Sequence, residues 1–162
     1  MKLPDLVLIV TTASTALMSG FFYAYSISVS PGLSKVPDKA FIETMQNINR
    51  EVQNPFFFSC FFGTLILLSL SAILFRDDPV MVSLLSTGSL LYILGVFGTT
   101  VLFNVPLNNY LAGCDPETAT EENITAVRQH FESKWTSRNH IRSICSFISL
   151  LASIVACVVK HA

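Results

Sequence analysis

Uncharged and mostly apolar residues fill four long stretches of this chain. The stretches cover residues 6–34, 52–75, 79–114 and 143–159. A helix needs roughly 20 apolar residues to cross about 30 Å of hydrocarbon, so the first three stretches are long enough and the fourth is at the lower limit. The pattern therefore predicts four membrane-spanning helices, at about residues 6–28, 55–75, 80–103 and 141–159.

Two of the connecting segments predict further helices. Apolar residues recur every three or four positions over about residues 37–52 and again over about residues 121–139, which is the period of an amphipathic helix. The turn between the second and third stretches is short and polar, so these spans form an antiparallel hairpin. We expect an all-α, integral membrane four-helix bundle, formed by residues 1–162 as a single transmembrane domain. Both short helices then lie on one side of the membrane.

The last predicted helix has a polar and an apolar face. At about 100° per residue, one face carries Trp135, Arg138, Asn139, Arg142, Ser146, Ser149 and Ser153. The opposite face carries Ile144, Phe147, Ile148, Leu151 and Val155. Ionisable groups inside a membrane face the bundle interior, so we expect Arg142 to point inward and the bulky apolar side chains to meet lipid. His140 falls close to the lipid-facing side, unless the helix bends near Arg138.

Pro106 lies between Asn104 and Asn108, near the end of the third stretch. Proline lacks an amide hydrogen and clashes with the preceding turn, so the carbonyl group of Leu102 loses its partner and the helix bends. Irregular backbone at membrane depth is tolerated where it lines a cavity or is buried in protein. We therefore expect a polar pocket beside the two asparagine side chains.

The first predicted span carries small residues at every fourth position, Ala16, Gly20 and Ala24. This spacing lets the backbone of another helix approach closely, either inside the bundle or between the subunits of a homo-oligomer. The span ends in an aromatic cluster that includes Tyr23 and Tyr25. Such rings are typical of the membrane interface.

The composition supports a membrane protein and argues against one class of partner. The chain is 51% hydrophobic and only 13% charged, which is too apolar for a soluble domain. Its formal net charge is -1 and it has no basic block, so we expect lipid rather than nucleic acid as a partner. The apolar run after Lys2 is too long for a signal peptide, and we interpret it as a retained span. We expect a multi-pass integral membrane protein and assign neither a membrane nor an orientation.

The cysteine and histidine residues form no recognised metal motif. Three cysteines lie in predicted spans and one lies in a loop: Cys60, Cys145, Cys157 and Cys114. Because they show neither CxxC nor Cys/His spacing, the sequence predicts no disulfide framework and no metal site. The histidines His130, His140 and His161 form no i, i+4 pair, which argues against a haem with two histidine ligands.

Four groups of residues follow one another along the chain. They are Gly20-Phe21-Phe22-Tyr23 with a following Pro31-Gly32-Leu33, then Asn49 and Asn54, then Asn104-Val105-Pro106-Leu107-Asn108, and finally Trp135 with Arg138, His140 and Arg142. In this order and spacing they resemble the anthrone oxygenase-like family of small four-span membrane proteins. The resemblance implies the four-span fold. Some members of that family are implicated in oxidising an anthrone to an anthraquinone with molecular oxygen, without a bound cofactor, so the fold is implied more strongly than the reaction.

On that resemblance we expect a membrane oxidoreductase that acts on a flat, hydrophobic, phenolic or quinone-like substrate. Loss of a proton from the methylene group of an anthrone gives an anion that reacts with oxygen, so the site needs a base, a donor to the oxyanion and an apolar slot. The candidate catalytic residues are His140 as the base and Arg142, Asn104 and Asn108 as oxyanion donors. The candidate substrate-binding residues are Trp135, Tyr23, Asn139, Gln46 and Asn49. We expect no metal ligand and no cofactor.

Two alternatives stay open at this point. In the first, the chain is a haem- or metal-binding membrane redox protein in which His140 is a single axial haem ligand. In the second, it is a non-enzymatic assembly or interaction subunit whose two loop helices form a docking cap. The Ala16, Gly20 and Ala24 stripe would then be an oligomer contact.

Overall fold

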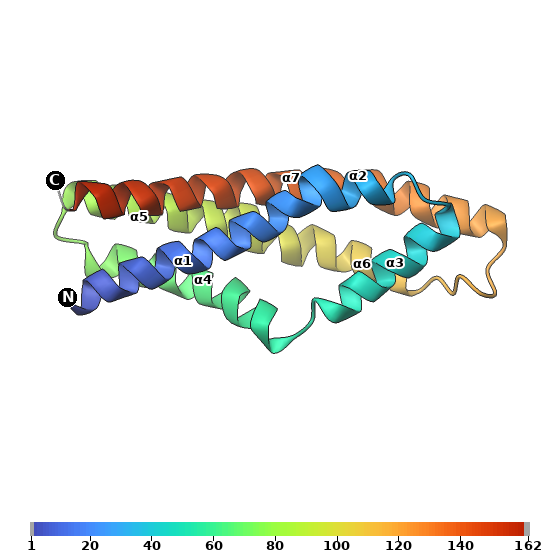
Figure 1. Cartoon of the computed structure of the whole chain (residues 1–162), viewed down its shortest axis with the longest axis horizontal. Coiled ribbons are helices and arrows are strands. Elements are labelled where there is room, and N and C mark those ends of the chain that lie inside the picture. The colour runs from blue at the N-terminus through green and yellow to red at the C-terminus, as the bar shows by residue number, and fades with distance from the viewer. Residues whose placement is uncertain (1, 161–162) are drawn as a thin grey trace.

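The computed structural model describes residues 2–160, which form four long helical rods and one shorter helix (Figure 1). His161 lies outside the described residues. The rods are Leu3–Leu33, Pro55–Leu74, Pro79–Ala112 and Glu121–Val159, and each is long and apolar enough to cross a membrane. The all-α class and the four predicted spans are confirmed for the described part of the chain, which is a multi-pass integral membrane protein.

The rods differ in how many helical elements they contain. The first joins α1 (Leu3–Ala24), the π-helical segment η1 (Tyr25–Val29) and α2 (Ser30–Leu33), and the second is α4 (Pro55–Leu74). The third joins α5 (Pro79–Leu91), the π-helical segments η2 (Tyr92–Gly98) and η3 (Thr100–Asn104), and α6 (Val105–Ala112). The fourth is the single helix α7 (Glu121–Val159), and the short helix is α3 (Asp38–Glu51). In Figure 1, α3 and α4 meet at a corner that projects away from α7.

Three rods are longer than the sequence predicts, and the first of them continues to Leu33 instead of ending near residue 28. The third continues to Ala112 instead of ending near residue 103. The fourth is one helix of 39 residues where two helices, at about 121–139 and 141–159, were expected. Glu121–Val159 contains no glycine and no proline, so nothing interrupts its backbone hydrogen bonds.

Pro31 and Pro106 do not end the rods that contain them. Each comes shortly after a π-helical segment, η1 and η3 respectively. The N–H group of Ser30 donates to the carbonyl of Tyr25 and that of Val105 to the carbonyl of Thr100, so each helix is one residue wider just before its proline. The disruption expected at Pro106 therefore takes the form of a π-helical turn, a feature that is frequent at functional sites.

The two faces predicted for α7 are confirmed. Ser146, Ser149 and Ser153 are fully buried, whereas the apolar side chains opposite them are exposed: Ile144, Phe147, Ile148, Leu151 and Val155. Ser149 Oγ donates to the carbonyl of Gly88 at 2.8 Å. Gly95 lies so close to α7 that a Cβ atom there would be 2.2 Å from Cys145 Sγ. The third rod thus packs on α7 at small residues, as is usual between helices in membranes.

The small residues of α1 face outward. Ala16, Gly20 and Ala24 are exposed, and no atom beyond its own helix backbone lies within 4 Å of a Cβ position on Gly20. α1 contacts the bundle with a neighbouring face, formed by Thr11, Thr15, Met18, Ser19 and Phe22. Of the two alternatives left open for this stripe, packing inside the bundle is therefore excluded, because the hydroxyl-bearing face is the one that meets α4 and α7.

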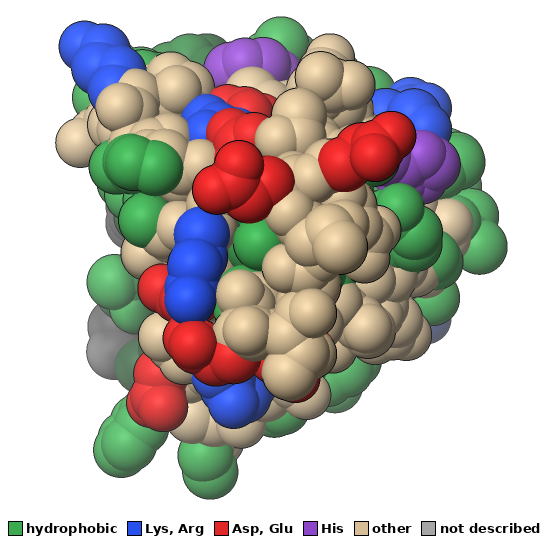
Figure 2. Space-filling model, turned by 90° about the vertical axis from the view of Figure 1, so that its right-hand side faces the viewer, with side chains coloured by type: hydrophobic (Ala, Val, Ile, Leu, Met, Phe, Trp, Pro, Cys, Tyr) green, Lys and Arg blue, Asp and Glu red, His purple; other side chains and the backbone are tan. Residues whose placement is uncertain are grey.

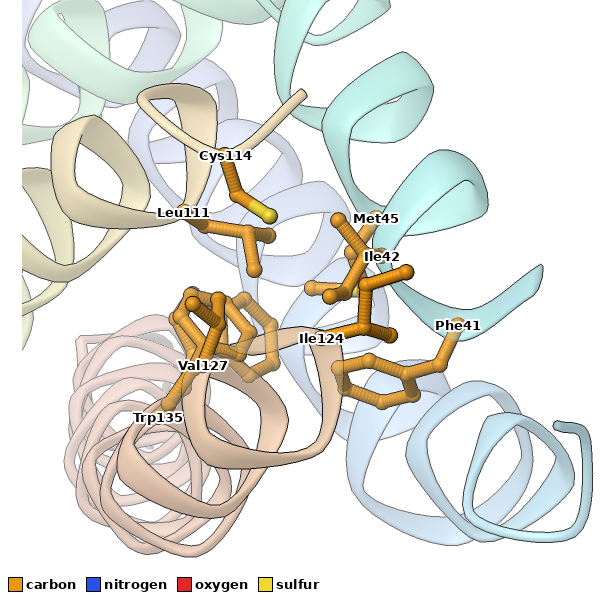
Figure 3. Packing of buried hydrophobic residues seen from close by; sticks show 9 residues of the cluster. Phe41, Ile42, Met45, Leu111, Cys114, Ile124, Val127 and Trp135 are labelled. Carbon is orange, nitrogen blue, oxygen red and sulfur yellow. The ribbon is translucent and has the colours of Figure 1, made fainter. Parts of the chain in front are cut away.

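The helix α3 covers the ends of α6 and α7. Figure 3 shows its side chains Phe41, Ile42 and Met45 packed toward Leu111 and the first turns of α7. Arg128 of α7 fixes the start of α3, because it donates to Asp38 Oδ1 at 2.9 Å and to the carbonyls of Val36 and Ser34. Acidic and basic side chains gather on this end of the molecule (Figure 2). The end with α3 is therefore polar outside and apolar inside.

Candidate functional site

A cavity of about 270 Å³ lies between the middle of α7, the η3–α6 part of the third rod, and the corner where α3 and α4 meet. η1 contributes one residue, Tyr25, from the side of the first rod. Its lining comprises Phe21, Tyr25, Ile48, Asn49, Val52, Gln53, Phe57, Phe58, Phe61, Phe62, Phe97, Thr100, Val101, Asn104, Val105, Asn108, Asn109, Trp135, Asn139 and Arg142. Both π-helical segments before the prolines therefore border this cavity.

Aromatic rings form much of the cavity wall. Phe57 and Phe61 of α4 are stacked, with ring centroids 5.4 Å apart and planes at 15°. Phe97 lies 5.7 Å from Phe61, and Trp135 faces them from α7. A wall of this kind offers flat apolar surface, which suits the faces of aromatic rings in a ligand.

Arg142 brings a positive charge to this wall. Its side chain is buried, and its guanidinium group lies over the rings of Phe22, at 4.7 Å, and Trp135, at 5.1 Å. Nη2 donates to Asn139 Oδ1 at 3.0 Å and Nη1 to Thr100 Oγ1 at 3.4 Å. None of the ion pairs within residues 2–160 includes Arg142. The expected inward orientation is confirmed, and all of its protein partners are uncharged.

Three polar atoms at the cavity lack a hydrogen-bond partner within the described chain. They are Arg142 Nε, Asn49 Nδ2 and Asn104 Oδ1. Asn104 is 1% exposed, and its Nδ2 donates only a long bond, 3.5 Å, to the carbonyl of Trp135. Buried polar groups in proteins are nearly always paired. Two donors and one acceptor are therefore unpaired in residues that line one cavity.

Asn108 and Trp135 hold each other in place. The indole Nε1 donates to Asn108 Oδ1 at 2.9 Å, and the Trp135 ring also lies 5.7 Å from that of Tyr25. The structure thus brings most of the predicted site residues to one cavity: Asn49, Asn104, Asn108, Trp135, Asn139 and Arg142.

Three predicted site residues lie elsewhere. His140 is exposed on the far side of α7, where it lines a separate polar groove with Ser133 and Ser137. Tyr23 is 57% exposed, whereas Tyr25, two positions later, faces the cavity. Gln46 donates to the carbonyls of Leu111 and Cys114 at 2.8 and 2.7 Å, so it ties α3 to the end of α6.

His140 is still connected to the cavity by hydrogen bonds. Its Nδ1 lies 3.1 Å from Ser26 Oγ. Asn139 Nδ2 donates to the same hydroxyl at 2.9 Å and to the carbonyl of Phe22 at 3.1 Å, while Asn139 Oδ1 accepts from Arg142. The imidazole therefore reaches Arg142 through two intervening side chains and does not touch the cavity itself.

Several lining residues were missed by the sequence analysis. Thr100 precedes Asn104 by four residues, as Asn104 precedes Asn108, so helical spacing alone could have identified it. Phe57, Phe61 and Phe97 resemble ordinary lipid-facing or core residues, and nothing in their spacing distinguishes them. The cavity wall is thus harder to predict than its polar groups.

Metal ligands do not gather in the described part of the chain. Among those residues, no three His, Cys, Asp or Glu side chains lie close enough to hold an ion. His130 and His140 are ten residues apart on α7, which separates them by about 15 Å along the helix. They therefore cannot act as two ligands of one centre within this chain.

The chain matches one family model over more than half of its length. The model is described as anthrone oxygenase, and it matches residues 57–152. This segment covers nearly all of α4, the whole third rod and most of α7, and it includes Asn104, Asn108 and Arg142. No curated protein and no solved structure matches the chain. With the family match extending across three of the four rods that enclose the cavity, the chain belongs to the anthrone oxygenase family.

Proposed function

We propose that the cavity binds a flat, hydrophobic, phenolic or quinone-like molecule and that the protein oxidises this molecule with molecular oxygen, without a bound cofactor. One observation supports this most directly: three residues that line a single cavity with aromatic walls each carry an unpaired polar atom. Family membership agrees with the same reaction.

The dimensions of the cavity favour a compact ligand. Its volume of about 270 Å³ is near the lower end of the range of roughly 300–1,000 Å³ for small-molecule sites. A molecule of two or three fused rings suits this space better than a lipid with long acyl chains. The stacked rings of Phe57 and Phe61 would lie along its faces.

The lining also suggests how such a molecule reaches the cavity. Phe58 and Phe62 of α4 and Val101 and Val105 of the third rod border the cavity and are exposed. These side chains face hydrocarbon in a bilayer, so the space between the two rods opens sideways into the membrane. A hydrophobic substrate dissolved in lipid can therefore enter without crossing water.

The polar groups suit the chemistry of an anthrone. Loss of a proton from its methylene group places negative charge on the carbonyl oxygen, and Arg142 Nε and Asn49 Nδ2 are free donors for such an oxyanion. The electron-rich carbon then reacts with oxygen. Overall the methylene carbon loses two hydrogens and gains one oxygen atom to become a carbonyl, and the second oxygen atom leaves as water.

Oxygen uptake by the protein in lipid nanodiscs, with anthrone as the substrate, tests this proposal. We expect uptake above that of empty nanodiscs, with anthraquinone as the product. Arg142→Met should lower the rate about a hundredfold, as is typical for loss of an oxyanion donor. Phe147→Leu, a change on the lipid-facing side of α7, should leave the rate unchanged.

Two results would contradict the proposal. The first is uptake no faster than in empty nanodiscs, and the second is an equal rate for the wild-type protein and Arg142→Met. An absorption spectrum of the purified protein tests the cofactor separately. A Soret band, or a stoichiometric content of iron or copper, would overturn the cofactor-independent part.

A further inference from the structure

We propose that the cavity binds its ligand as an aromatic oxyanion, a phenolate or enolate, whose charge is balanced by Arg142. This inference rests on the proposed function, because it concerns the same cavity, and it specifies the ionisation state of the ligand there. It also assigns Arg142 a role before oxygen reacts: the residue selects the deprotonated molecule.

Arg142 has no counter-ion among the described residues. Two other cations that are partly shielded from solvent have carboxylate partners, whereas Arg138, which is shielded to a similar degree, lies over the ring of Phe103. Arg128 pairs with Asp38 and Glu132, and Lys160 pairs with Asp5. Arg142 is 6% exposed and pairs with no carboxylate in residues 2–160. An unpaired buried charge is costly, and the cost is recovered when an anion binds beside it.

The residues that line the cavity around the guanidinium of Arg142 supply no carboxylate. The residues that line the cavity include no Asp, Glu, His or Lys, and Tyr25 of η1 is the one other titratable side chain there. The remaining lining residues carry amides, the hydroxyl of Thr100, aromatic rings or aliphatic side chains, none of which is charged. Negative charge at this site therefore has to come from the ligand.

Arg142 is held in place by its hydrogen bonds while one of its three nitrogen atoms, Nε, has no partner. Its hydrogen-bond acceptor Asn139 is fixed by two further bonds, to the carbonyl of Phe22 and to Ser26 Oγ. Arg142 Nε has no partner. A donor fixed in advance loses little entropy when it pairs with an anion, and hydrogen bonds to charged groups are the strong ones.

The cavity also lacks a proton acceptor of its own. His140, the expected base, lies on the far side of α7. A ligand that enters as the anion needs no base inside the cavity, since it has already released its proton to water at the membrane surface, before it moves through the lipid to the opening between the rods. Selection of the anion by Arg142 thus takes the place of proton removal within the site.

A binding experiment without oxygen separates this inference from catalysis. The probes are 4-nitro-1-naphthol in mildly alkaline buffer, where it is ionised and coloured, and its methyl ether, which has the same rings and cannot ionise. We expect the wild-type protein to bind the naphtholate at least about tenfold more tightly than the ether. The bound probe should also ionise at lower pH than the free probe.

Substitutions at Thr100 provide a matched pair, because Thr100 Oγ1 already contacts Arg142. Thr100→Asp supplies a carboxylate to the guanidinium and should abolish the preference for the naphtholate. Thr100→Asn has nearly the same shape without the charge and should retain it. Arg142→Gln should lose the preference, Arg142→Lys should keep part of it, and Arg138→Gln, a charge change one turn away and outside the cavity, should have no effect.

The possible outcomes test the charge of the ligand, its aromatic character and the proposed function separately. Equal affinities for the naphtholate and the ether in the wild-type protein, or an unchanged preference in Thr100→Asp, would overturn the anion inference. Displacement of the probe by decanoate at equal concentration would overturn its aromatic part, because a fatty acid carries the same charge without rings. A clear preference for the naphtholate without oxygen uptake on anthrone would support the inference and contradict the proposed function.

Discussion

Asn139 holds several parts of the site together through its hydrogen bonds. It is fully buried, and its amide joins three elements through Arg142 of its own helix, the Phe22 carbonyl of α1 and the Ser26 hydroxyl of η1. Each of its donors and its acceptor is used, so the side chain cannot turn without losing a bond. The direction of Arg142 therefore depends on a neighbour that does not contribute a free polar atom to the cavity.

The position of His140 outside the cavity predicts that its removal has little effect on the oxygen-uptake rate. A general base contributes about 10²–10⁴-fold to a rate, and a base must touch the proton that it removes. Because His140 lies outside the cavity, His140→Ala should change oxygen uptake with anthrone by less than about twofold. The matched variant Arg142→Met should lose far more of the oxygen-uptake rate. A hundredfold loss in His140→Ala, with unaltered folding, would instead restore the imidazole as the base.

Helical period explains which site residues the sequence could identify. Arg142, Asn139 and Trp135 were assigned to one face because a regular helix fixes their relative directions, and α7 is regular throughout. Tyr23 was chosen in place of Tyr25, although Tyr25 follows Phe21 by one helical turn and lines the cavity with it, so the period of the helix would have favoured Tyr25. Gln46 pairs with carbonyls 65 and 68 residues away in sequence, which local patterns cannot reveal.

At the scale of elements, the third rod and α7 approach each other through glycine. Gly95→Ala would place a Cβ atom 2.2 Å from Cys145 Sγ, so one of the two helices has to move. We expect a loss of roughly 1–3 kcal/mol in the free energy of unfolding, measured by denaturation in mild detergent. Gly20→Ala on α1 has open space around it and is the control. Equal stability of the two variants would mean that η2 and α7 are not packed as described.

The docking of α3 should depend on pH. The hydrogen bond from Thr125, followed by those from Arg128, holds the pKa of Asp38 below its ordinary value. A carboxyl group with a lowered folded-state pKa stabilises the fold above its unfolded pKa, about 3.9, and this contribution is lost as the pH falls below that value. Since Asp38 is 36% exposed, the effect should be about 1 kcal/mol at most.

Hydrogen exchange of the α3 amides between neutral pH and pH of about 3 measures this contribution. The protection factors of the α3 amides, which correct for the slower intrinsic exchange at low pH, should fall on acidification in the wild-type protein and should be low at both pH values in Asp38→Asn. Asp115, whose pKa is also lowered, by hydrogen bonds within its own loop, provides the control substitution Asp115→Asn. An identical pH response in Asp38→Asn and the wild-type protein would show that α3 is held by its apolar side chains alone.

Much of the arrangement of elements followed from the sequence, and the exceptions have a common cause. The spans were set by hydrophobic length, and the faces of α7 by its period. The extension of the third rod past Pro106 was not foreseen, and the direction of the small-residue stripe of α1 was left open, because each depends on a competing local solution. In α1, the face that carries hydroxyl groups contacts the bundle and the small-residue face does not. In the third rod, a π-helical turn accommodates the proline without ending the helix.

At the scale of the whole molecule, the second and third rods, which border the opening of the cavity, are not in contact along their full length. α4 packs on α5 and η2, while its first turns and α3 form the projecting corner of Figure 1. Phe58 and Phe62 on one side and Val101 and Val105 on the other are exposed at the resulting opening. Access from the bilayer should therefore be limited by the size of these side chains.

Val101→Phe tests this route with a built-in reporter. Trp135 is the one tryptophan of the chain and lines the cavity, so quenching of its fluorescence by 4-nitro-1-naphtholate in stopped flow follows arrival of the probe. Narrowing the opening should lower the association rate by about tenfold and the dissociation rate in proportion, which leaves the affinity nearly unchanged. Leu94→Phe adds the same ring to an exposed position away from the cavity and should alter neither rate. If Val101→Phe weakened binding with an unchanged association rate, the side chain would contact the bound molecule, and the probe would reach the cavity by another path.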